Sequence, residues 1–395
     1  MTTAREVVVL SGVRTPVGRY GGGLKDFSPS TLGAMVIREA VDRAGVAPGD
    51  VGHVVFGHVV PTEKHDVYLA RVAAVNGGLP VQVPALTVNR LCGSGLQAIV
   101  NAAQTIMLGD ADCTVAGGSE SMSRGAYLAS NHRWGQRMGN SELVDAVSGG
   151  LSDPFDNCHM GVTAENVAAK WGVSREDQDA LAVASHRRAA RATANGYFKE
   201  QMLPVEVKSK TGTTVIDCDE HIRPDATLGA MAKLRPVFTE NGTVTAGNAS
   251  GMNDAASAVV LMERGEAERR GLRPMARLVG YSHAGVEPKY MGVGPVPAVK
   301  SLLLRTGLRV EDLDVIELNE AFAAQVIAVM RDLGLPEDKT NPNGSGISIG
   351  HPVSATGCIL TVKALYELER TSGRYALVTM CIGGGQGIAA IFERL

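Results

Sequence analysis

The sequence predicts an α/β protein made of two similar halves, with a segment of different character between them. Short β-branched runs alternate with alanine-rich helical stretches, which is the pattern of α/β layering. A short motif also recurs 262 residues further along the chain, at Arg43 and again at Arg305. The 395 residues are enough for a large double domain, so core size sets no constraint.

The first elements alternate in type along the chain. Val7–Leu10 and Val54–Phe56 are β-branched runs that predict strands, and Leu32–Arg43 and Leu69–Val75 predict helices. Strands that alternate with helices are typical of βαβ units. We therefore expect a largely parallel sheet.

The repeat indicates a duplicated unit. Each copy ends a helix with a glycine, Gly45 or Gly307, and a strand follows. The same offset aligns Gly95 with Gly357, each at the start of a further helix. We expect the two halves to pack about a pseudo-two-fold axis that brings these helix starts together. The expected helices cover residues 96–107 and 359–368.

An inserted loop domain is expected at residues 120–241. Within it, Ser174 to Asp177 resembles a capping box and predicts a helix that stops before Gly196. Arg187, Arg188 and Arg191 on this helix fit either a solvated face or a phosphate-binding site. The expected limits of the core halves are 1–119, continued at about 242–270, and 271–395.

Composition excludes several classes of protein. The net charge of −3 and pI near 6.3 argue against a nucleic-acid-binding protein. The six cysteines lack paired spacing, so neither a metal site nor a disulfide scaffold is expected, and reduced thiols point to the cytoplasm. The apolar run near the N-terminus is too short for a signal peptide, and we expect no membrane-spanning segment.

Cys92 has the sequence setting of a nucleophile. An apolar run over residues 83–88 ends just before it, and a helix-forming stretch begins just after it. A thiol near helix N-terminal N–H groups is expected to have a lowered pKa, which favours the reactive thiolate. Taken alone, Cys92 fits equally well as a small buried apolar residue.

Three further clusters lie in the C-terminal half. Asn319 to Phe322 ends a strand, the glycine-rich stretch 341–357 contains His351, and Cys381 closes the last core strand before residues 383–385. A lone histidine is more often structural than catalytic. The glycines at 344–346 do not follow a strand and open a helix, which argues against a nicotinamide or flavin site.

Taken together, these motifs resemble the thiolase family, and the matching stretches cover nearly the whole chain. They are Arg14-Thr15-Pro16, Asn89–Ala98, Gly117–Ser123, His159–Gly161, Asn248–Gly251, Met291–Pro295, Asn319–Phe322, Gly350–Pro352 and Cys381–Gly385. Within the family the chain most resembles biosynthetic β-ketothiolases, the acetyl-CoA acetyltransferases that supply polyhydroxyalkanoate precursors. The resemblance implies the thiolase fold, a layered α-β-α-β-α core with an inserted loop domain, and a homotetramer.

The resemblance also implies a mechanism. Cys92 would attack an acyl-CoA thioester while His351 takes its proton, and Cys381 would then deprotonate a second acetyl-CoA to give a 3-oxoacyl-CoA. His351 and a water held by Asn319 would form one oxyanion hole, and the backbone N–H groups of Cys92 and Gly383 the other. CoA thioesters would be substrates, with no permanently bound cofactor and no metal.

By the same resemblance, coenzyme A would lie across the inserted segment, and Met291 would line the acyl pocket. Met160, Phe238 and Met291 fit equally well as plain core residues. The positions that match CoA contacts of the family are His159, Met160, Arg223, Phe238, Ala246, Ala249, Ser250 and Phe322.

Two departures from the family pattern stand out. Ser354, which the repeat aligns with Cys92, replaces a usual glycine and would add strain beside His351 if φ there is positive. Ala230 replaces a serine that often helps to hold CoA. Acyl chain length and direction stay open. The alternatives are a degradative 3-ketoacyl-CoA thiolase, an inert acyl-CoA-binding scaffold, or a decarboxylating condensing enzyme, against which Cys381 argues.

Overall fold

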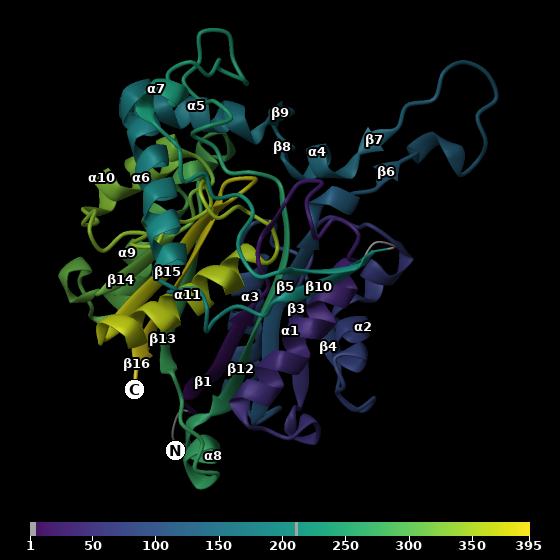
Figure 1. Ribbon diagram of the computed structural model, residues 1–395, viewed down its shortest axis with the longest axis vertical. Helices are drawn as coiled ribbons and strands as arrows, with labels where there is room; N and C mark the ends of the chain where they lie inside the picture. Colours follow the sequence, from purple (N-terminus) through teal and green to yellow (C-terminus); the bar gives the residue numbers. More distant parts are fainter. Residues whose placement is uncertain (1–4, 210–211) are drawn as a thin grey trace.

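Two halves of similar build share one mixed sheet, as seen in the computed structural model, which describes residues 5–209 and 212–395 (Figure 1). The N-terminal half contributes β1 (Val7–Arg14), β2 (Gly18–Arg19), β3 (His53–Gly57), β4 (Ala85–Val88), β5 (Cys113–Ser121) and β12 (Asn253–Glu263). The C-terminal half contributes β13 (Ala276–Gly285), β14 (Val315–Leu318), β15 (Tyr375–Ile382) and β16 (Gln386–Arg394). The strand order is β14-β15-β16-β13-β1-β12-β5-β3-β4, and β2 pairs with β12.

The strand order repeats between the halves, which confirms the duplicated unit. From the edge inward, the N-terminal half has the order β4, β3, β5, β12 and β1. With β2 set aside, these are the third, second, fourth, fifth and first strands of that half along the chain. The C-terminal half has the same order, with a bridge between Ile316 and Thr340 in place of its third strand. Antiparallel pairing of Val8 with Arg277 joins the two first strands.

The expectation of a largely parallel sheet was wrong. Only β3 with β4, β3 with β5, and β14 with β15 are parallel, and the other pairings in the large sheet are antiparallel. The strand that carries Cys381 is also not the last one. Gly384 and Gly385 adopt φ values of 80° and 85°, and this tight turn returns the chain antiparallel as β16.

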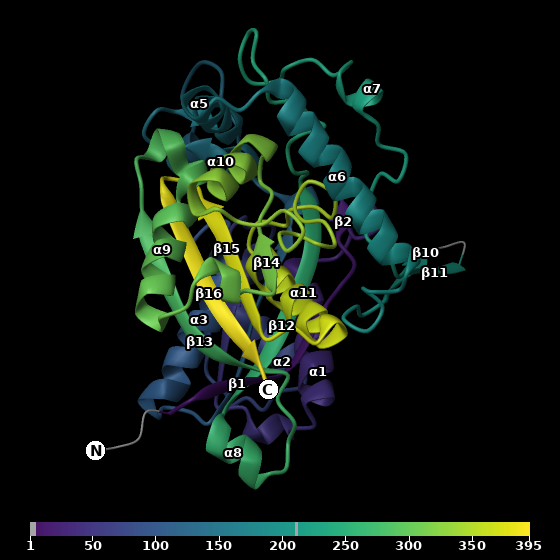
Figure 2. The ribbon, with the colours of Figure 1, turned by 90° about the vertical axis from the view of Figure 1, so that its left-hand side faces the viewer.

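Helices form three layers around the two halves of the sheet. On β12, Val259 and Leu261 face the central pair of helices, whereas Val260 and Met262 face the outer helices of the N-terminal half. The central layer holds α3 (Ser94–Leu108) and α11 (Thr356–Thr371); the outer layers hold α1 (Pro29–Ala44), α2 (Leu69–Asn76), α9 (Pro295–Thr306) and α10 (Ala323–Leu333), with α8 (Arg264–Arg269) at one end (Figure 2). The α-β-α-β-α layering is therefore confirmed.

One described helical stretch, Leu91–Leu108, has the length and apolar composition of a membrane span, contrary to our expectation that none would. It contains α3, the central core helix, and 61% of the stretch is buried inside the molecule. A buried core helix meets the same criteria of length and composition.

The inserted segment leaves the core after Ser121 and returns at Asn253, so the chain re-enters the sheet later than the expected residue 242. The loop between its first two strands extends away from the rest of the molecule (Figure 1). Its elements are β6 (Tyr127–Leu128), β7 (Val144–Asp145), α4 (Ala146–Gly150), β8 (Ser152–Asp153), β9 (Cys158–His159), α5 (Met160–Trp171), α6 (Arg175–Ala194), β10 (Val205–Ser209), β11 (Gly212–Ile216) and α7 (Leu228–Met231).

The basic residues of α6 serve neither of the two expected purposes fully. Arg188 Nη1 donates to the Thr340 carbonyl at 3.0 Å, and Arg191 Nη2 donates to the Pro342 carbonyl at 2.8 Å. These contacts attach α6 to the loop that precedes His351. Two of the three arginines are therefore structural.

The starts of α3 and α11 touch, as the repeat predicts. A Cβ atom on Gly95 would lie 2.7 Å from the Ser354 carbonyl oxygen and 2.8 Å from the Cys358 nitrogen. A Cβ on Gly357 would lie 2.4 Å from the Leu96 nitrogen. Only glycine permits this close backbone approach, which brings the Cys92 and His351 loops together.

We expect Gly95→Ala to lower the free energy of unfolding by about 1–3 kcal/mol, because the added methyl must displace backbone atoms. The matched control is Gly229→Ala in α7, where nothing lies within 4 Å of the added atom. Thermal or chemical denaturation of both variants measures the effect. Equal stability of the two variants would contradict the tight helix contact.

Candidate active site

The predicted catalytic side chains converge from the two halves at one pocket. Cys92 lies in the turn between β4 and α3, His351 precedes α11, and Cys381 lies near the end of β15. All three line a cavity of about 360 Å³, together with Gly383. The remaining expected residues on its wall are His159, Met160, Arg223, Phe238, Ala246, Ala249, Ser250, Met291 and Phe322.

The turn that carries Cys92 is held rigidly by its own hydrogen bonds. Leu91 adopts a positive φ of 46° and donates its N–H to Asn89 Oδ1 at 2.9 Å. Ser94 Oγ donates to the Leu91 carbonyl at 2.7 Å and accepts from the Arg90 N–H at 2.8 Å. A positive φ at a non-glycine residue is uncommon and is found often at functional sites.

The expectation of a lowered thiol pKa at Cys92 was wrong. Burial in the pocket raises the pKa to about 11, while N–H groups of Gly383 and of Cys92 itself act in the opposite direction. Loss of water around the sulfur therefore outweighs the helix terminus. Cys92 is a neutral thiol at pH 7 and needs a base to become a thiolate.

His351 is arranged to be that base. The backbone N–H of His351 donates to Asn253 Oδ1 at 2.9 Å, and the ring atom Nδ1 lies 2.6 Å from Thr356 Oγ1. Thr356 Oγ1 donates its proton to the Pro352 carbonyl at 3.0 Å, so Nδ1 must carry a hydrogen and Nε2 a lone pair. Burial lowers the pKa of His351 to about 4, which leaves the imidazole neutral at pH 7.

Asn319 lies behind His351 rather than on the pocket wall. Its Nδ2 lies 3.4 Å from His351 Nε2, and its buried Oδ1 has no hydrogen-bond partner among the described residues. A Cβ on Gly346 would lie 2.8 Å from that oxygen, so glycine is needed to leave the amide its place. An unpaired buried amide oxygen is a suitable position for a bound water.

Cys381 lines the same pocket as Cys92 and lies near it. Burial, and then the nearby Cys92, raise the pKa of the Cys381 thiol far above its usual value. Cys381 is therefore a neutral thiol in the free protein, and its thiolate would be a strong base. Two residues further along, Gly383 packs closely against Met160. A Cβ on Gly383 would lie only 2.7 Å from Met160 Cε, so a larger side chain would not fit there.

The inserted segment supplies an aromatic wall to the pocket. The rings of His159 and Phe238 stack with centroids 4.6 Å apart, and Phe238 meets Phe322 edge to face at 6.3 Å. A Cβ on Gly161 would lie 2.2 Å from the Phe238 ring, so α5 can approach this wall only with glycine there. The pocket is mostly apolar, with Arg223 as a cation on its wall.

Sequence reasoning missed part of the lining. Four of the missed residues lie inside motifs that were recognised, and these are Leu91, Met122, Gly251 and Ala321. Val353 follows such a motif, and His221 lies two residues before Arg223, so position in the sequence was the available signal for these residues. The missed residues are Leu91, Met122, Gly150, Leu151, His221, Val237, Gly251, Met252, Ala321 and Val353.

The two departures from the family pattern have different outcomes. Ser354 does not adopt a positive φ, so the strain expected there does not arise. Its N–H donates to Glu120 Oε2 at 3.0 Å, and its Oγ donates to the Ser119 carbonyl at 2.9 Å. Ala230 is exposed on α7 and lies outside the pocket lining.

A buried charge cluster lies directly behind Ser354. His58 Nδ1 lies 3.2 Å from Glu120 Oε1, and His58 Nε2 lies 3.7 Å from Asp66 Oδ2. Burial opposes the charge on His58, but hydrogen bonds with Asp66 and Glu120 outweigh it and raise the pKa to about 10. Burial likewise opposes the charge on Asp66, yet the contact with His58 helps to lower its pKa to about 2.

We expect this cluster to make the protein less stable as the pH becomes alkaline. The folded pKa of His58, about 10, lies above the ordinary value of 6.5, so its contribution is complete below about pH 6.5 and is lost as the pH rises towards 10. The loss of unfolding free energy should be on the order of a few kcal/mol. Denaturation curves across this range measure it, and His58→Gln should remove the His58-linked part. If the unfolding free energy of His58→Gln falls with pH as steeply as that of the wild type, the assignment to His58 is contradicted.

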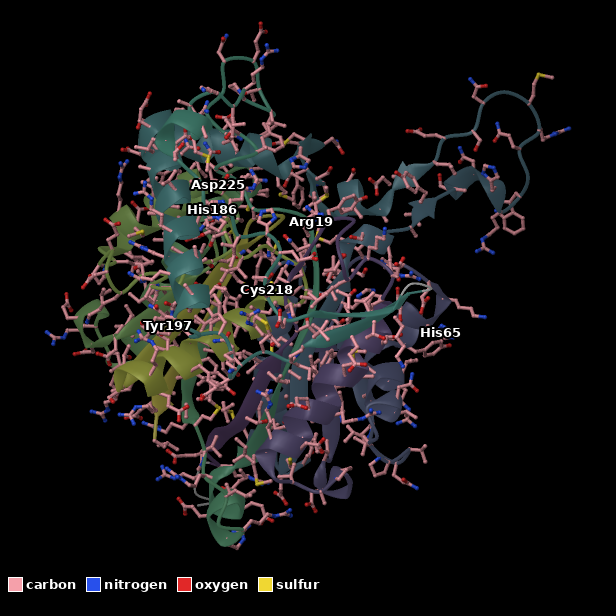
Figure 3. All side chains as sticks on the ribbon, in the orientation of Figure 1. Arg19, His65, His186, Tyr197, Cys218 and Asp225 are labelled. Carbon is pink, nitrogen blue, oxygen red and sulfur yellow. The ribbon has the colours of Figure 1, made fainter. Side chains whose placement is uncertain are left out.

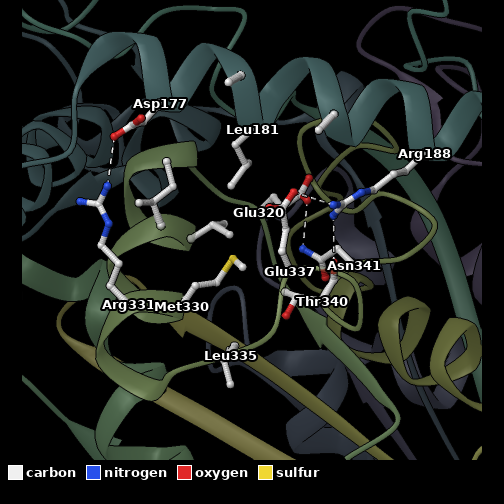
Figure 4. A pocket seen from close by; sticks show the side chains of 14 residues that line it. Asp177, Leu181, Arg188, Glu320, Met330, Arg331, Leu335, Glu337, Thr340 and Asn341 are labelled. Carbon is white, nitrogen blue, oxygen red and sulfur yellow. Dashed lines mark hydrogen bonds and ion pairs between the residues drawn. The ribbon is translucent and has the colours of Figure 1, made fainter.

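Other features lie outside this pocket. A cavity of about 430 Å³ opens between α6 and α10, with ion pairs Asp177–Arg331 and Arg188–Glu337, each at 3.0 Å, on its rim (Figure 4). It contains none of the nucleophiles. All six cysteines lie in the described residues and are unpaired, and Cys218, marked in Figure 3, is exposed and outside the active-site lining.

Comparison with known proteins agrees with this geometry. Residues 7–265 match the thiolase N-terminal domain, and residues 272–394 match the thiolase C-terminal domain. The chain is 67% identical to Beta-ketothiolase BktB of Cupriavidus necator over 392 residues, covering 99% of this chain and 100% of that protein.

Two solved structures have the same fold over the full chain. The acetyl-CoA acetyltransferase of Bacillus anthracis superposes with a TM-score of 0.98 at 43% identity and covers 100% of both chains. The human mitochondrial 3-ketoacyl-CoA thiolase in complex with CoA superposes with a TM-score of 0.96 at 43% identity, over 99% of this chain and 98% of that one. The chain therefore belongs to the thiolase family.

Proposed function

We propose that this chain is an acyltransferase that condenses acetyl-CoA with a short acyl-CoA to give a 3-oxoacyl-CoA and CoA, and that it also catalyses the reverse thiolysis. The observation that supports this best is the meeting of Cys92, Cys381 and the neutral His351 in one largely apolar pocket. Two thiols and a base are the groups that an acyl-cysteine route needs.

Acylation begins at Cys92. His351 Nε2 takes the thiol proton, and the thiolate attacks the thioester carbonyl of the acyl-CoA. The N–H groups of Cys92 and Gly383 stabilise the charge that develops on the carbonyl oxygen. The bond to the CoA sulfur then breaks, Cys381 protonates the departing thiolate, and the acyl group remains on Cys92.

Condensation begins at Cys381, which is now a thiolate. It removes a proton from the methyl carbon of a second acetyl-CoA, and the enolate oxygen accepts hydrogen bonds from protonated His351 and from a water held by Asn319. The carbanion attacks the acyl carbonyl, the bond to Cys92 breaks, and His351 returns its proton to Cys92. All protons are therefore accounted for at the end of the cycle.

The pocket walls fit a CoA thioester. Arg223 would meet a phosphate of the nucleotide, and this local cation suits a chain of net charge −3. The apolar stretch around His159, Phe238 and Phe322 would hold the pantetheine arm. CoA thioesters are proposed as the substrates, with no permanently bound cofactor.

The biosynthetic short-chain role is the finer part of the proposal. Met160 and Met291 lie on the wall of the cavity, and Met291 would line the part that takes the acyl group. By the motif resemblance, the proposed role is the supply of 3-oxoacyl-CoA for polyhydroxyalkanoate synthesis, and the relative from Cupriavidus necator is named a beta-ketothiolase. The alternative is degradative 3-ketoacyl-CoA thiolysis, and the human relative is named a 3-ketoacyl-CoA thiolase.

Thiolysis assays test both levels of the proposal. Wild-type protein should cleave acetoacetyl-CoA, Cys92→Ala should have no activity, and Cys218→Ala should match wild type because that thiol lies outside the pocket. Normal turnover by Cys92→Ala would refute the function. Rates should fall as the 3-oxoacyl chain lengthens beyond acetoacetyl-CoA, and a steady rise would favour the degradative class.

We also propose a cytoplasmic homotetramer. Trp134 and Met138, each 92% exposed, lie on the extended loop of the inserted segment, where exposed apolar side chains support self-association. The six unpaired cysteines suit a reducing compartment. Light scattering should give the mass of four chains, and the mass of one chain would exclude the tetramer.

A further inference from the structure

The carboxylate of Glu120 is buried beside the active site, yet the proposed reaction does not use it. Glu120 is fully buried on β5, and its Oε1 accepts the Val60 N–H at 3.0 Å. Its Oε2 accepts the Ser354 N–H at 3.0 Å, three residues beyond His351. His58 Nδ1 lies 3.2 Å from Oε1 of Glu120. A carboxylate so placed joins the His351 loop to a buried cation.

The charge of Glu120 acts on both members of the first proton transfer. It works to raise the pKa of His351 against the larger effect of burial. It also adds to the burial that raises the pKa of the Cys92 thiol. The carboxylate therefore favours a proton on His351 and also favours a proton on Cys92.

In the free protein, the other described groups that face His351 leave Glu120 as its nearby negative charge, and once Cys92 is acylated the Cys381 thiolate adds a second one. Asn319 approaches from the end of β14, Asn253 from β12 and Thr356 from α11, and all three are uncharged. Cys92 and Cys381 are neutral thiols in the free protein. Behind Glu120, the cation His58 lies between two carboxylates, the second being Asp66.

We propose that Glu120 is a positioning residue that holds the His351 loop through the Ser354 N–H, and that its negative charge stabilises the protonated form of His351 while Cys92 carries the acyl group. The proposal rests on the function proposed above. Within the acyl-enzyme Cys92 is an uncharged thioester, so only the stabilisation of the protonated imidazole remains. That imidazole is the donor to the enolate oxygen. Condensation therefore depends on Glu120 more than acylation does.

Glu120→Gln should separate the two half-reactions. Condensation of acetyl-CoA should slow by at least about tenfold, while acetylation of Cys92, followed by intact-protein mass after rapid quenching, changes much less. Alkylation of Cys92 by iodoacetamide should shift to lower pH, since the thiol loses a nearby negative charge. A purely structural defect would not slow condensation and at the same time shift Cys92 alkylation to lower pH.

The matched control is Glu165→Gln. Glu165 also binds backbone N–H groups, those of Thr243 and Val244 at 2.8 Å each, but makes no contact with the His351 loop. This control should leave the condensation rate and the alkylation profile unchanged. Glu120→Asp, which keeps the charge, should recover part of the condensation rate.

Unchanged condensation and alkylation profiles in Glu120→Gln would overturn the proposal, as would a folded Glu120→Asp variant that recovers none of the condensation rate. Absence of acetyl-Cys92 in the wild type would instead refute the proposed function.

Discussion

Replacing Cys381 by alanine is expected to stop carbon–carbon bond formation while Cys92 still takes up an acetyl group. Cys381 lines the same pocket as Cys92, and burial keeps it a neutral thiol until the departing CoA takes its proton. Without this sulfur, the bases left in the described lining are imidazoles, which are much weaker bases than a thiolate of Cys381. The condensation rate should fall by roughly 10³-fold or more.

Two measurements on the same sample check this expectation. Intact-protein mass follows the acetyl group on Cys92, and acetoacetyl-CoA formation follows condensation. Acetylation should slow only modestly, since water can protonate the departing CoA thiolate. Cys218→Ala, which removes an exposed thiol, is the control and should behave as wild type. Condensation by Cys381→Ala at the wild-type rate would contradict the two-thiol route.

Replacing His351 by asparagine is expected to slow both half-reactions by about 10²–10⁴-fold, because the base for Cys92 and the donor to the enolate are lost together. The size of the effect follows from the thiol: with a pKa of about 11, Cys92 does not ionise unaided at neutral pH. In the wild type, acylation should keep its rate as the pH falls until it approaches about 4, where His351 becomes protonated.

Thr356 provides a graded companion to the His351 variant. Its hydroxyl accepts the Nδ1 hydrogen and so keeps the lone pair of His351 on Nε2. Thr356→Ser retains that acceptor and should keep most of the activity, whereas Thr356→Val should lower it by about tenfold. Equal rates in both variants would show that the tautomer is not controlled in this way.

The sequence was most informative where the signal is local. The turn around Cys92, the helix that begins after Ser174 and the repeat that aligns Gly95 with Gly357 each depend on a few neighbouring residues, and the structure contains all of them. The pocket lining was predicted largely through the motif resemblance. Its members come from both halves and from the inserted segment, and spacing along the chain alone does not bring them together.

Properties that arise from tertiary packing were not accessible in the same way. The pKa of Cys92 depends on how much water the folded pocket excludes, and burial outweighs the helix terminus that the sequence suggested. Ser354 escapes strain because its backbone is not in the left-handed region and because Glu120 and Ser119 accept its hydrogen bonds. The antiparallel pairings follow from turns that reverse the chain, such as the one between β15 and β16. The alternation of strand-like and helix-like stretches in the sequence does not define the direction of such turns.

The most direct test of the account is the covalent state of Cys92 during turnover. Protein mixed with acetyl-CoA, quenched and digested should carry one acetyl group on the peptide that contains Cys92, and a second substrate, CoA, should remove it. Cys92→Ala should carry none. An acetylated wild-type Cys92 that is formed and consumed at the rate of turnover is the result we predict. Turnover without any acyl-Cys92, or an acetyl group held elsewhere, would contradict it.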